Sequence, residues 1–341
     1  MEAAKKIAEA VLYEGYLLWP YRRSARKNQQ RWTFGGVYPR AYSEARGEDD
    51  PWLMQTQCLV SGVEEATVEV KVRFLHVVER KVARKRGDVA CNVSTLEFVE
   101  ELRIGGELYL PWEEAAEREV AVGRFKLSEL QSPKRASIDI PEGSTEEALA
   151  EPTGEVVGAV VRGWRTLRGM VEVEAEPLRE GLFKVTVRIT NTTPWEGQDR
   201  EGTLRQTFVS THTALEVKGG EFVSLTDPPE KLLEAVRACE NLKTWPVLVG
   251  EEGDRSKVLS SPIILYDYPQ IAPESPGDLF DGTEIDQLLI LNVMTLTDEE
   301  KEEVRASDPR AREILERCES LSPEELMNLH GAVREFRMLR E

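Results

Sequence analysis

The sequence predicts a mainly β protein, with two antiparallel β-sandwich-like units followed by a short helical C-terminal tail. Apolar residues occupy alternate positions from Val68 to Phe74, and charged residues fill the positions between them, which is the pattern of a half-buried strand. This alternation recurs along the first three quarters of the chain, at the spacing typical of sandwiches and open barrels. Helix-start signals are concentrated after residue 297.

The length of the chain predicts more than one unit. Its 341 residues exceed the roughly 250–300 residues at which a single hydrophobic core stops growing. The stretch PEGSTEEALAEPTG at 141–154 is rich in loop-forming residues and offers little that a core could bury, so we place a linker there. The predicted units are a β unit at 1–145, a sandwich-like unit at 146–296 and a helical tail at 297–341.

The clearest local element is a hairpin in the second unit. Two alternating runs, from Val171 to Ala175 and from Phe183 to Ile189, flank a turn at 179–181 that ends in glycine. This arrangement predicts two antiparallel strands. Runs of β-branched and aromatic residues predict further strands at 11–19, 31–38, 53–61, 117–125, 155–164, 204–212, 214–224, 262–266 and 285–296.

Helices are predicted at one place in the second unit and in the tail. Asp227 and the two prolines after it supply an N-cap and a preset first turn for a helix at 228–240. Capping signatures then mark the tail. They are Thr297 with Glu300, Asp308 with Pro309, and Ser322 with Glu325.

Composition limits the classes of partner and the location. With 44 basic and 62 acidic residues, the formal charge is −18, so we expect no nucleic-acid partner and no attraction to anionic membranes. The N-terminus lacks the apolar stretch of a signal peptide, and nowhere do about 18 apolar residues run together without charge. We therefore expect a cytoplasmic protein without membrane insertion.

The sequence contains no recognisable catalytic or cofactor motif. Its four cysteines are far apart and include no C-x-x-C pair, which argues against a zinc knuckle and against a compact disulfide framework. A G-x-S-x-G elbow, an H-E-x-x-H helix, a P-loop and a G-x-G-x-x-G loop are all lacking. We expect no cofactor and no tightly bound transition metal.

One histidine and one acidic loop give an enzymatic or metal-handling alternative. His212 lies at a strand end with hydroxyl residues on both sides, so it could serve as a base or a ligand, although a structural histidine is commoner. The proline-containing loop at 267–286 carries carboxylates of the kind that hard cations prefer, but their spacing does not match an EF-hand. The candidate set is His212, Asp278, Asp281, Glu284 and Asp286.

Two segments are candidates for binding a protein partner. Near the N-terminus, aromatic residues alternate with arginines, a combination common at interfaces. The acidic loop at 267–286 is stiffened by three prolines, and its opposite charge leaves open that the two segments pair with each other. The candidate residues are Trp19, Tyr21, Arg22, Arg23, Arg26, Trp32, Tyr266, Tyr268 and Phe280.

Three stretches together resemble an uncharacterised bacterial family associated with gene clusters for actinobacterial-type, high-affinity [NiFe] uptake hydrogenases. They are LYEGYLLWPYRRSARKNQQRWTFGGVYPRAY from Leu12, FVSTHT at 208–213, and SSPIILYDYPQIAPESPGDLFDGTEIDQLL from Ser260. The resemblance spans nearly the whole chain but transfers no catalytic residue. It implies an accessory, assembly or maturation role, with hydrogenase subunits or maturation factors as partners.

The residues constrain what that role can be. A [NiFe] large subunit needs paired C-x-x-C motifs and an iron–sulfur subunit needs closely spaced cysteines, and this chain has neither. We therefore expect a noncatalytic accessory or assembly protein that acts through protein–protein contacts. The alternative is a metal-handling protein or hydrolase-like enzyme centred on His212 and the acidic residues at 278–286.

Overall fold

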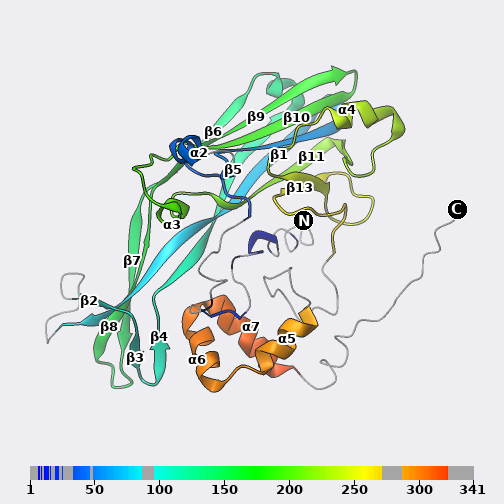
Figure 1. The fold of residues 1–341 in the computed structure, drawn as a ribbon. Helices are drawn as coiled ribbons and strands as arrows, with labels where there is room; N and C mark the ends of the chain where they lie inside the picture. The colour runs from blue at the N-terminus through cyan, green and yellow to red at the C-terminus, as the bar shows by residue number, and fades with distance from the viewer. Residues whose placement is uncertain are drawn as a thin grey trace.

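The computed structural model shows a mainly β protein with a large antiparallel sheet and short C-terminal helices, which confirms the predicted fold class (Figure 1). Among the residues described, no helix is long and apolar enough to cross a membrane. The structure describes residues 7, 9, 11–14, 16, 20–22, 25, 34–46, 49–86, 96–270 and 286–321, without the side chains of 286–288.

A single long strand, β1 (Leu53–Lys85), organises the sheet. Its 33 residues run the length of the sheet (Figure 1) and pair with strands from both sides of residue 145. Its pairing with β11 shifts register between Gly62 and Thr67, whereas β10 pairs with residues up to Ser61 and β5 with residues from Thr67 onward. The partners of β1 are β2 (Leu96–Val99), β5 (Trp112–Lys126), β8 (Val156–Trp164), β10 (Leu182–Asn191) and β11 (Val209–Val223).

The remaining strands extend the sheet in both directions from β1. On one side, β10 pairs with β9 (Leu167–Arg179), which confirms the predicted hairpin, and β9 pairs with β6 (Lys134–Ile140). Gly181, at the turn of this hairpin, has φ +71°, a conformation that glycine adopts without strain. On the other side, β11 pairs with β13 (Lys257–Ser261), and β13 with the edge strand β12 (Trp245–Leu248).

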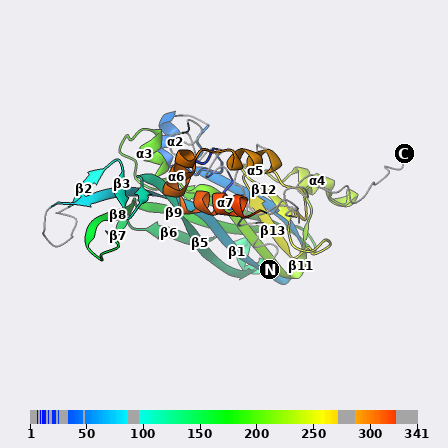
Figure 2. The same cartoon turned by 90° about the horizontal axis from the view of Figure 1, so that it is seen from below.

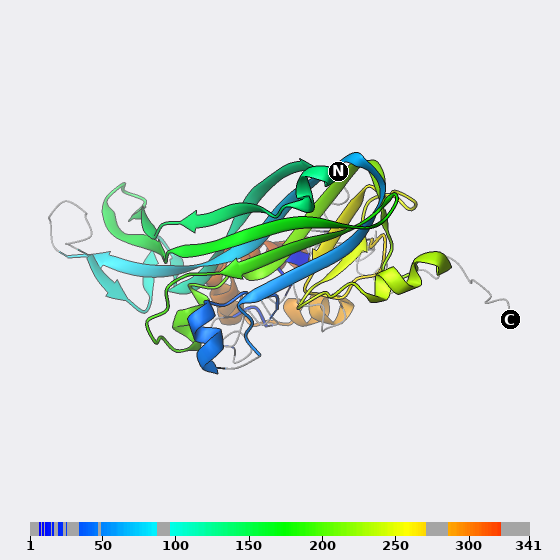
Figure 3. The same cartoon turned by 90° about the horizontal axis from the view of Figure 1, so that it is seen from above.

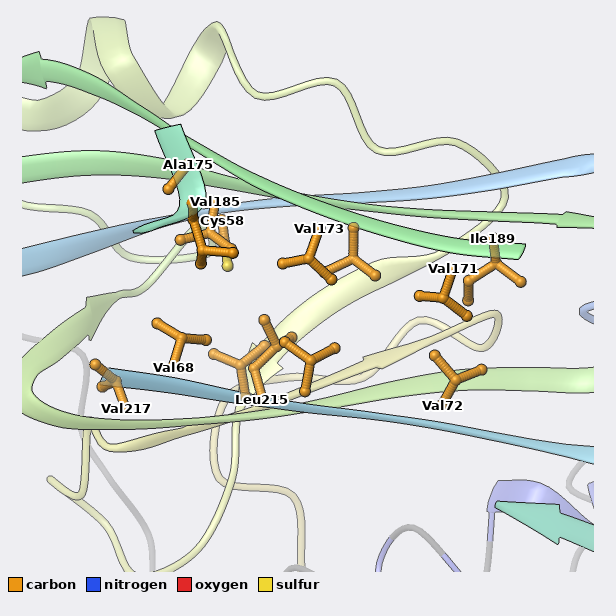
Figure 4. Close-up of a cluster of buried hydrophobic side chains, with 14 of the residues drawn as sticks. Cys58, Val68, Val72, Val171, Val173, Ala175, Val185, Ile189, Leu215 and Val217 are labelled. Carbon is orange, nitrogen blue, oxygen red and sulfur yellow. The ribbon is translucent and has the colours of Figure 1, made fainter. Parts of the chain in front are cut away.

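The main core lies between two layers of this curved sheet. In Figure 4, Val173, Val185 and other side chains of β9 and β10 face Val72, Leu215 and their neighbours on β1 and β11. The short 3₁₀ helix η3 (Leu127–Gln131) lies beside β9 and β1 and adds Leu127 to this core. The arrangement is sandwich-like because each strand directs alternate side chains inward.

A strand occupies the predicted linker. Residues 143–150 form β7 (Gly143–Ala150), which pairs with β8 along an arm that also holds β2 and the small sheet of β3 (Leu102–Ile104) and β4 (Glu107–Tyr109). The linker prediction was wrong because β7 buries only Leu149 and is otherwise open to solvent, so its composition resembles a loop. The division of the chain into units at residue 145 remains a prediction.

The helices follow the capping signals. Thr297 and Glu300 form the expected capping box at the start of α6 (Asp298–Ser307), and Asp308 caps α7 (Pro309–Ser320). The helix predicted at 228–240 is present but short, as η4 (Glu230–Leu232) and α4 (Leu233–Arg237). Two further short helices are α2 (Arg40–Arg46) and α3 (Arg200–Leu204).

Several predicted strands are not strands. Residues 262–266 form a bend and an irregular segment after β13, and within 34–38 only Val37 makes an isolated bridge, to Phe208. Residues 286–294 form helix α5 (Asp286–Met294), in which Leu289, Ile290 and Val293 are buried at helical spacing. An uninterrupted apolar run fits a buried helix as well as a buried strand, and the sequence pattern does not separate them. Within 11–19, the hydrogen bond from Tyr16 N–H to Tyr13 O belongs to a tight turn.

The C-terminal helices cover one face of the sheet and are held there by buried polar groups (Figures 2 and 3). The Arg80 guanidinium, on β1, donates to the carbonyl oxygens of Ala306 (2.7 Å) and Ser307 (2.6 Å) at the end of α6. Asp308 accepts hydrogen bonds from Trp112 Nε1 (3.2 Å) and from the Tyr16 hydroxyl. These contacts join the N-terminal segment and the C-terminal helices to the face of the sheet that they cover.

Candidate functional site

An open hollow of about 770 Å³ lies at the β12–β13 side of the sheet. Its wall includes Trp245 of β12 and Ser261 at the end of β13, together with loop residues at 34–36, 49–51, 262 and 264–266. A second hollow of about 620 Å³ adjoins it and shares Asp50, Pro51 and Lys243. Concave surfaces of this size are the usual places where proteins bind ligands or partner side chains.

Backbone hydrogen bonds fix the loop at 34–36 against β11. Phe34 O and Gly35 O accept from the N–H groups of Ser210 (3.2 Å) and Thr211 (3.0 Å). Gly35 has φ +58°, and a Cβ at this position would lie 2.5 Å from Pro262 Cγ. Glycine is therefore required here both by its backbone conformation and by the close approach of Pro262.

Five exposed apolar side chains surround the two hollows and are called here the apolar rim. Ile264 is 84% exposed and Tyr266 81% exposed, far more than residues of these types usually are. Contiguous exposed apolar surface of this kind marks interaction sites in soluble proteins. The apolar rim consists of Phe34, Leu242, Trp245, Ile264 and Tyr266.

Charged residues give the hollow an acidic side. Asp49 and Asp50 lie on its wall, where Lys243 is the one basic residue among those that the structure describes. The Tyr42 hydroxyl donates to Asp50 (3.0 Å), and Arg200 Nε lies 3.6 Å from the same carboxylate. These contacts hold the Asp50 side chain in place at the edge of the hollow.

Backbone strain is concentrated at this site. Ser210, Lys243 and Tyr268 have φ values of +49°, +59° and +54°, in the left-handed region that residues other than glycine seldom adopt. Lys243 lines the hollow, Ser210 contacts His212, and Tyr268 follows closely on Tyr266. Such strain costs about 1–3 kcal/mol per residue and is typical of functional sites.

His212 and Ser261 form a buried pair beside the hollow. Ser261 Oγ lies 3.1 Å from His212 Nε2, and His212 Nδ1 lies 2.7 Å from the backbone carbonyl oxygen of Ser210. Burial lowers the pKa of His212 to about 4, so the ring is neutral at neutral pH. The two residues come from adjacent strands, because β11 and β13 pair from Thr213 to Glu216.

The structure separates the predicted partner-binding residues. Tyr266 lies on the apolar rim, whereas Tyr268 is half-buried against the main core. Tyr21 is only 1% exposed, and Arg22 forms an ion pair with Glu300 on α6 (2.9 Å). Trp19, Arg23, Arg26, Trp32 and Phe280 lie outside the described residues.

The metal-handling alternative stays a prediction. Among the side chains that the structure describes, no group of three His, Cys, Asp or Glu residues converges on one point. The His212 ring makes its hydrogen bonds to a serine hydroxyl and a backbone carbonyl. The side chains of Asp278, Asp281, Glu284 and Asp286 lie outside the described residues.

Replacing Arg22 by glutamate is expected to lower the free energy of unfolding by about 1 kcal/mol, because the new carboxylate would face Glu300 across a partly buried contact. Chemical denaturation measures this. Lys126→Glu is the matched control, since Lys126 pairs with Glu65 on the open surface and its loss should change stability by less than about 0.5 kcal/mol. Unchanged stability of the Arg22 variant would show that the ion pair with Glu300 does not stabilise the fold.

The sequence did not single out most of the site. Phe34, Trp245, Ile264 and Ser261 come from three separate segments, and only the pairing of β11, β13 and β12 brings them together. The local signals were the stretch from Ser260, which contains Ser261 and two residues of the apolar rim, the stretch from Leu12, which contains Phe34, and His212. An apolar run that is followed by prolines does not reveal that its side chains are left exposed.

No protein-family model matches the chain, and a search of curated proteins finds no match either.

Proposed function

We propose that this protein is an accessory or assembly protein that binds a partner protein through the apolar rim. The observation that carries the proposal is the convergence of exposed aromatic and aliphatic side chains on one concave surface. Tryptophan and tyrosine are the side chains that most often dominate binding energy at interfaces. Trp245 and Tyr266 supply both at this surface.

The partner binds through side chains, since strand addition is blocked at this edge. Pro246 of the edge strand β12 has no N–H to donate. Two residues further along, the backbone N–H and carbonyl of Leu248 point in the same direction as the backbone nitrogen and carbonyl of Pro246. Both groups are already hydrogen-bonded: the N–H donates to Asp267 Oδ1 and the carbonyl accepts from Tyr268 N–H, each at 2.8 Å. An apolar side chain that enters the hollow is the contact that remains.

The charges around the hollow indicate which residues flank the apolar side chain of the partner. Two carboxylates, Asp49 and Asp50, line the hollow against one ammonium, Lys243, and the adjoining hollow adds Glu44. The whole chain carries a formal charge of −18. Complementary charge steers association, so the partner presents an apolar anchor between basic residues.

The family resemblance supports a more specific partner. It associates the chain with [NiFe] uptake hydrogenase clusters, and the absence of C-x-x-C pairs makes the chain unsuited to be a hydrogenase subunit itself. A hydrogenase subunit or a maturation factor is the partner we propose.

Affinity capture from the native host, with quantitative mass spectrometry, tests the proposal. We expect Trp245→Ser, Ile264→Ser and Tyr266→Ser, combined in one variant, to reduce recovery of hydrogenase proteins about 10-fold or more, as expected for loss of hot-spot residues. Titration of the purified partner should show the same loss of affinity. Thermal stability should stay nearly constant, because all three side chains are exposed.

A second triple variant provides the control. Val63→Ser, Phe98→Ser and Leu178→Ser remove exposed apolar side chains elsewhere on the molecule and should leave binding unchanged. Equal recovery with both triple variants, or no hydrogenase protein captured by the wild type, would refute the proposal.

A further inference from the structure

We propose that Ser261 and His212 form a nucleophile–base pair that hydrolyses a carboxylic ester held in the hollow. This activity is independent of the partner binding proposed above. The geometry that carries it is a serine hydroxyl, a histidine ring and an orienting carbonyl in sequence, with the serine on the wall of the hollow. A nucleophile within hydrogen-bond reach of a base, which a third group orients in turn, is the general pattern of nucleophilic catalysis.

Hydrogen-bond chemistry fixes the direction of each contact. The Ser210 carbonyl oxygen can only accept, so His212 Nδ1 carries the proton and donates it at 2.7 Å. In the neutral ring, Nε2 then holds the lone pair, and the Ser261 hydroxyl must donate to it at 3.1 Å. The proton of the hydroxyl is therefore already directed at the atom that would take it.

The surroundings of Ser261 favour a developing negative charge on its oxygen. The backbone N–H of Ile263 donates to Ser261 Oγ (3.1 Å), which leaves the hydroxyl proton free for His212. A donor to the oxygen stabilises an alkoxide more than a neutral hydroxyl. The orienting carbonyl belongs to Ser210, which holds the strained φ of +49°, so the fold maintains this contact at a cost.

The hollow offers a place for the substrate and a charge for the transition state. Ser261 shares its wall with Trp245 and Ile264, so the bound ester carries an apolar acyl group. Lys243 is the one basic residue on the described part of this wall, so it is the residue we assign to balance the charge of an oxyanion. Lys243 has a φ of +59°, so it is a second residue with a strained backbone beside the hollow.

The reaction balances without any co-reactant except water. Ser261 Oγ bonds to the ester carbonyl carbon while its proton passes to His212 Nε2. The carbon–oxygen bond to the alcohol then breaks, and the alcohol leaves with that proton. Water attacks the acyl-serine, gives a proton to His212, and releases the carboxylic acid as the proton returns to Ser261.

A fluorophosphonate probe on the full-length protein tests the pair, because this reagent phosphonylates serines that are activated by a base. We expect one adduct per chain, which peptide mapping assigns to Ser261. Labelling should vanish in Ser261→Ala and slow at least about 100-fold in His212→Gln, the usual contribution of a general base. The same variants should lose hydrolysis of p-nitrophenyl butyrate.

Ser260→Ala is the matched control. Its hydroxyl lies on the neighbouring residue but contacts Thr56 and Thr244 (2.8 Å each), so labelling of Ser261 should persist in the variant. Circular dichroism and melting curves establish that each variant is folded. Three results would overturn the proposal: no labelling of the wild-type protein, an adduct at another residue, or an unchanged rate in folded His212→Gln. The wild-type result is decisive even if a variant does not fold.

The pH profile separates a catalytic base from a merely structural histidine. Burial lowers the pKa of His212 to about 4, so the ring can accept a proton at neutral and mildly acidic pH. The labelling rate should hold down to about pH 5 and fall as the pH approaches that pKa, where the ring becomes protonated. A rate that halves near the ordinary histidine pKa of about 6.5 would contradict this assignment of the base.

Discussion

Replacing Arg80 by methionine is expected to lower the free energy of unfolding by about 3–5 kcal/mol, the cost of breaking a buried charged network. The Arg80 guanidinium is buried and donates to three carbonyl oxygens, those of Leu110, Ala306 and Ser307, as well as to Glu114 (3.0 Å). Methionine fills similar space but leaves these acceptors without donors. Guanidinium chloride denaturation measures the loss.

A surface arginine that contacts the same helix gives the control. Arg103 pairs with Glu302 on α6, but both side chains are exposed, so Arg103→Met should cost less than about 1 kcal/mol. Arg80→Lys should fall between the two, because lysine keeps the charge but not the planar fork that reaches several carbonyls. Equal losses for Arg80→Met and Arg103→Met would show that the buried network does not anchor α6 to the sheet.

The sequence was informative wherever structure depends on near neighbours. The hairpin of β9 and β10 follows from alternation around Gly181, and the capping box of Thr297 with Glu300 follows from a four-residue pattern. Both features are determined by residues that are close in the chain. They needed no knowledge of the tertiary structure.

Long-range pairing was beyond what the pattern reveals. Alternation marked part of β1 as a strand, but nothing local indicates that its 33 residues take five different partners. The same limit explains the errors at β7 and α5. Pairing with β8 holds the polar β7 in a strand, and packing against α7 holds the apolar α5 in a helix.

The candidate site shows this limit most clearly. His212 and Tyr266 were singled out from the sequence, but their relation to Ser261 and Trp245 depends on how β11, β13 and β12 align. Tyr21 was expected on a docking surface and is instead buried. A tyrosine fits both environments, and only the packing of the C-terminal helices decides between them.

Replacing Phe208 by alanine is expected to destabilise the protein by about 3–5 kcal/mol, the usual cost of removing a fully buried aromatic ring. Phe208 is inaccessible to solvent, and its ring centroid lies 4.7 Å from that of Phe74 in the main core. Its backbone exchanges two hydrogen bonds with Val37 (2.9 and 3.1 Å), next to the loop that lines the hollow. Phe98→Ala is the control, because Phe98 is exposed and its loss should be nearly neutral.

A double-mutant cycle with Gly169 tests whether this ring sets the packing of β9. A Cβ on Gly169 would lie 2.7 Å from Phe208 Cζ and 2.4 Å from Thr190 O, so Gly169→Ala alone should cost about 1–3 kcal/mol through overpacking. Combining it with Phe208→Leu removes the clash with the ring but not the clash with the backbone oxygen. The double variant should therefore be more stable than the sum of the single effects predicts, by about 0.5 kcal/mol or more. Strictly additive losses would show that the ring moves aside freely and does not restrict residue 169.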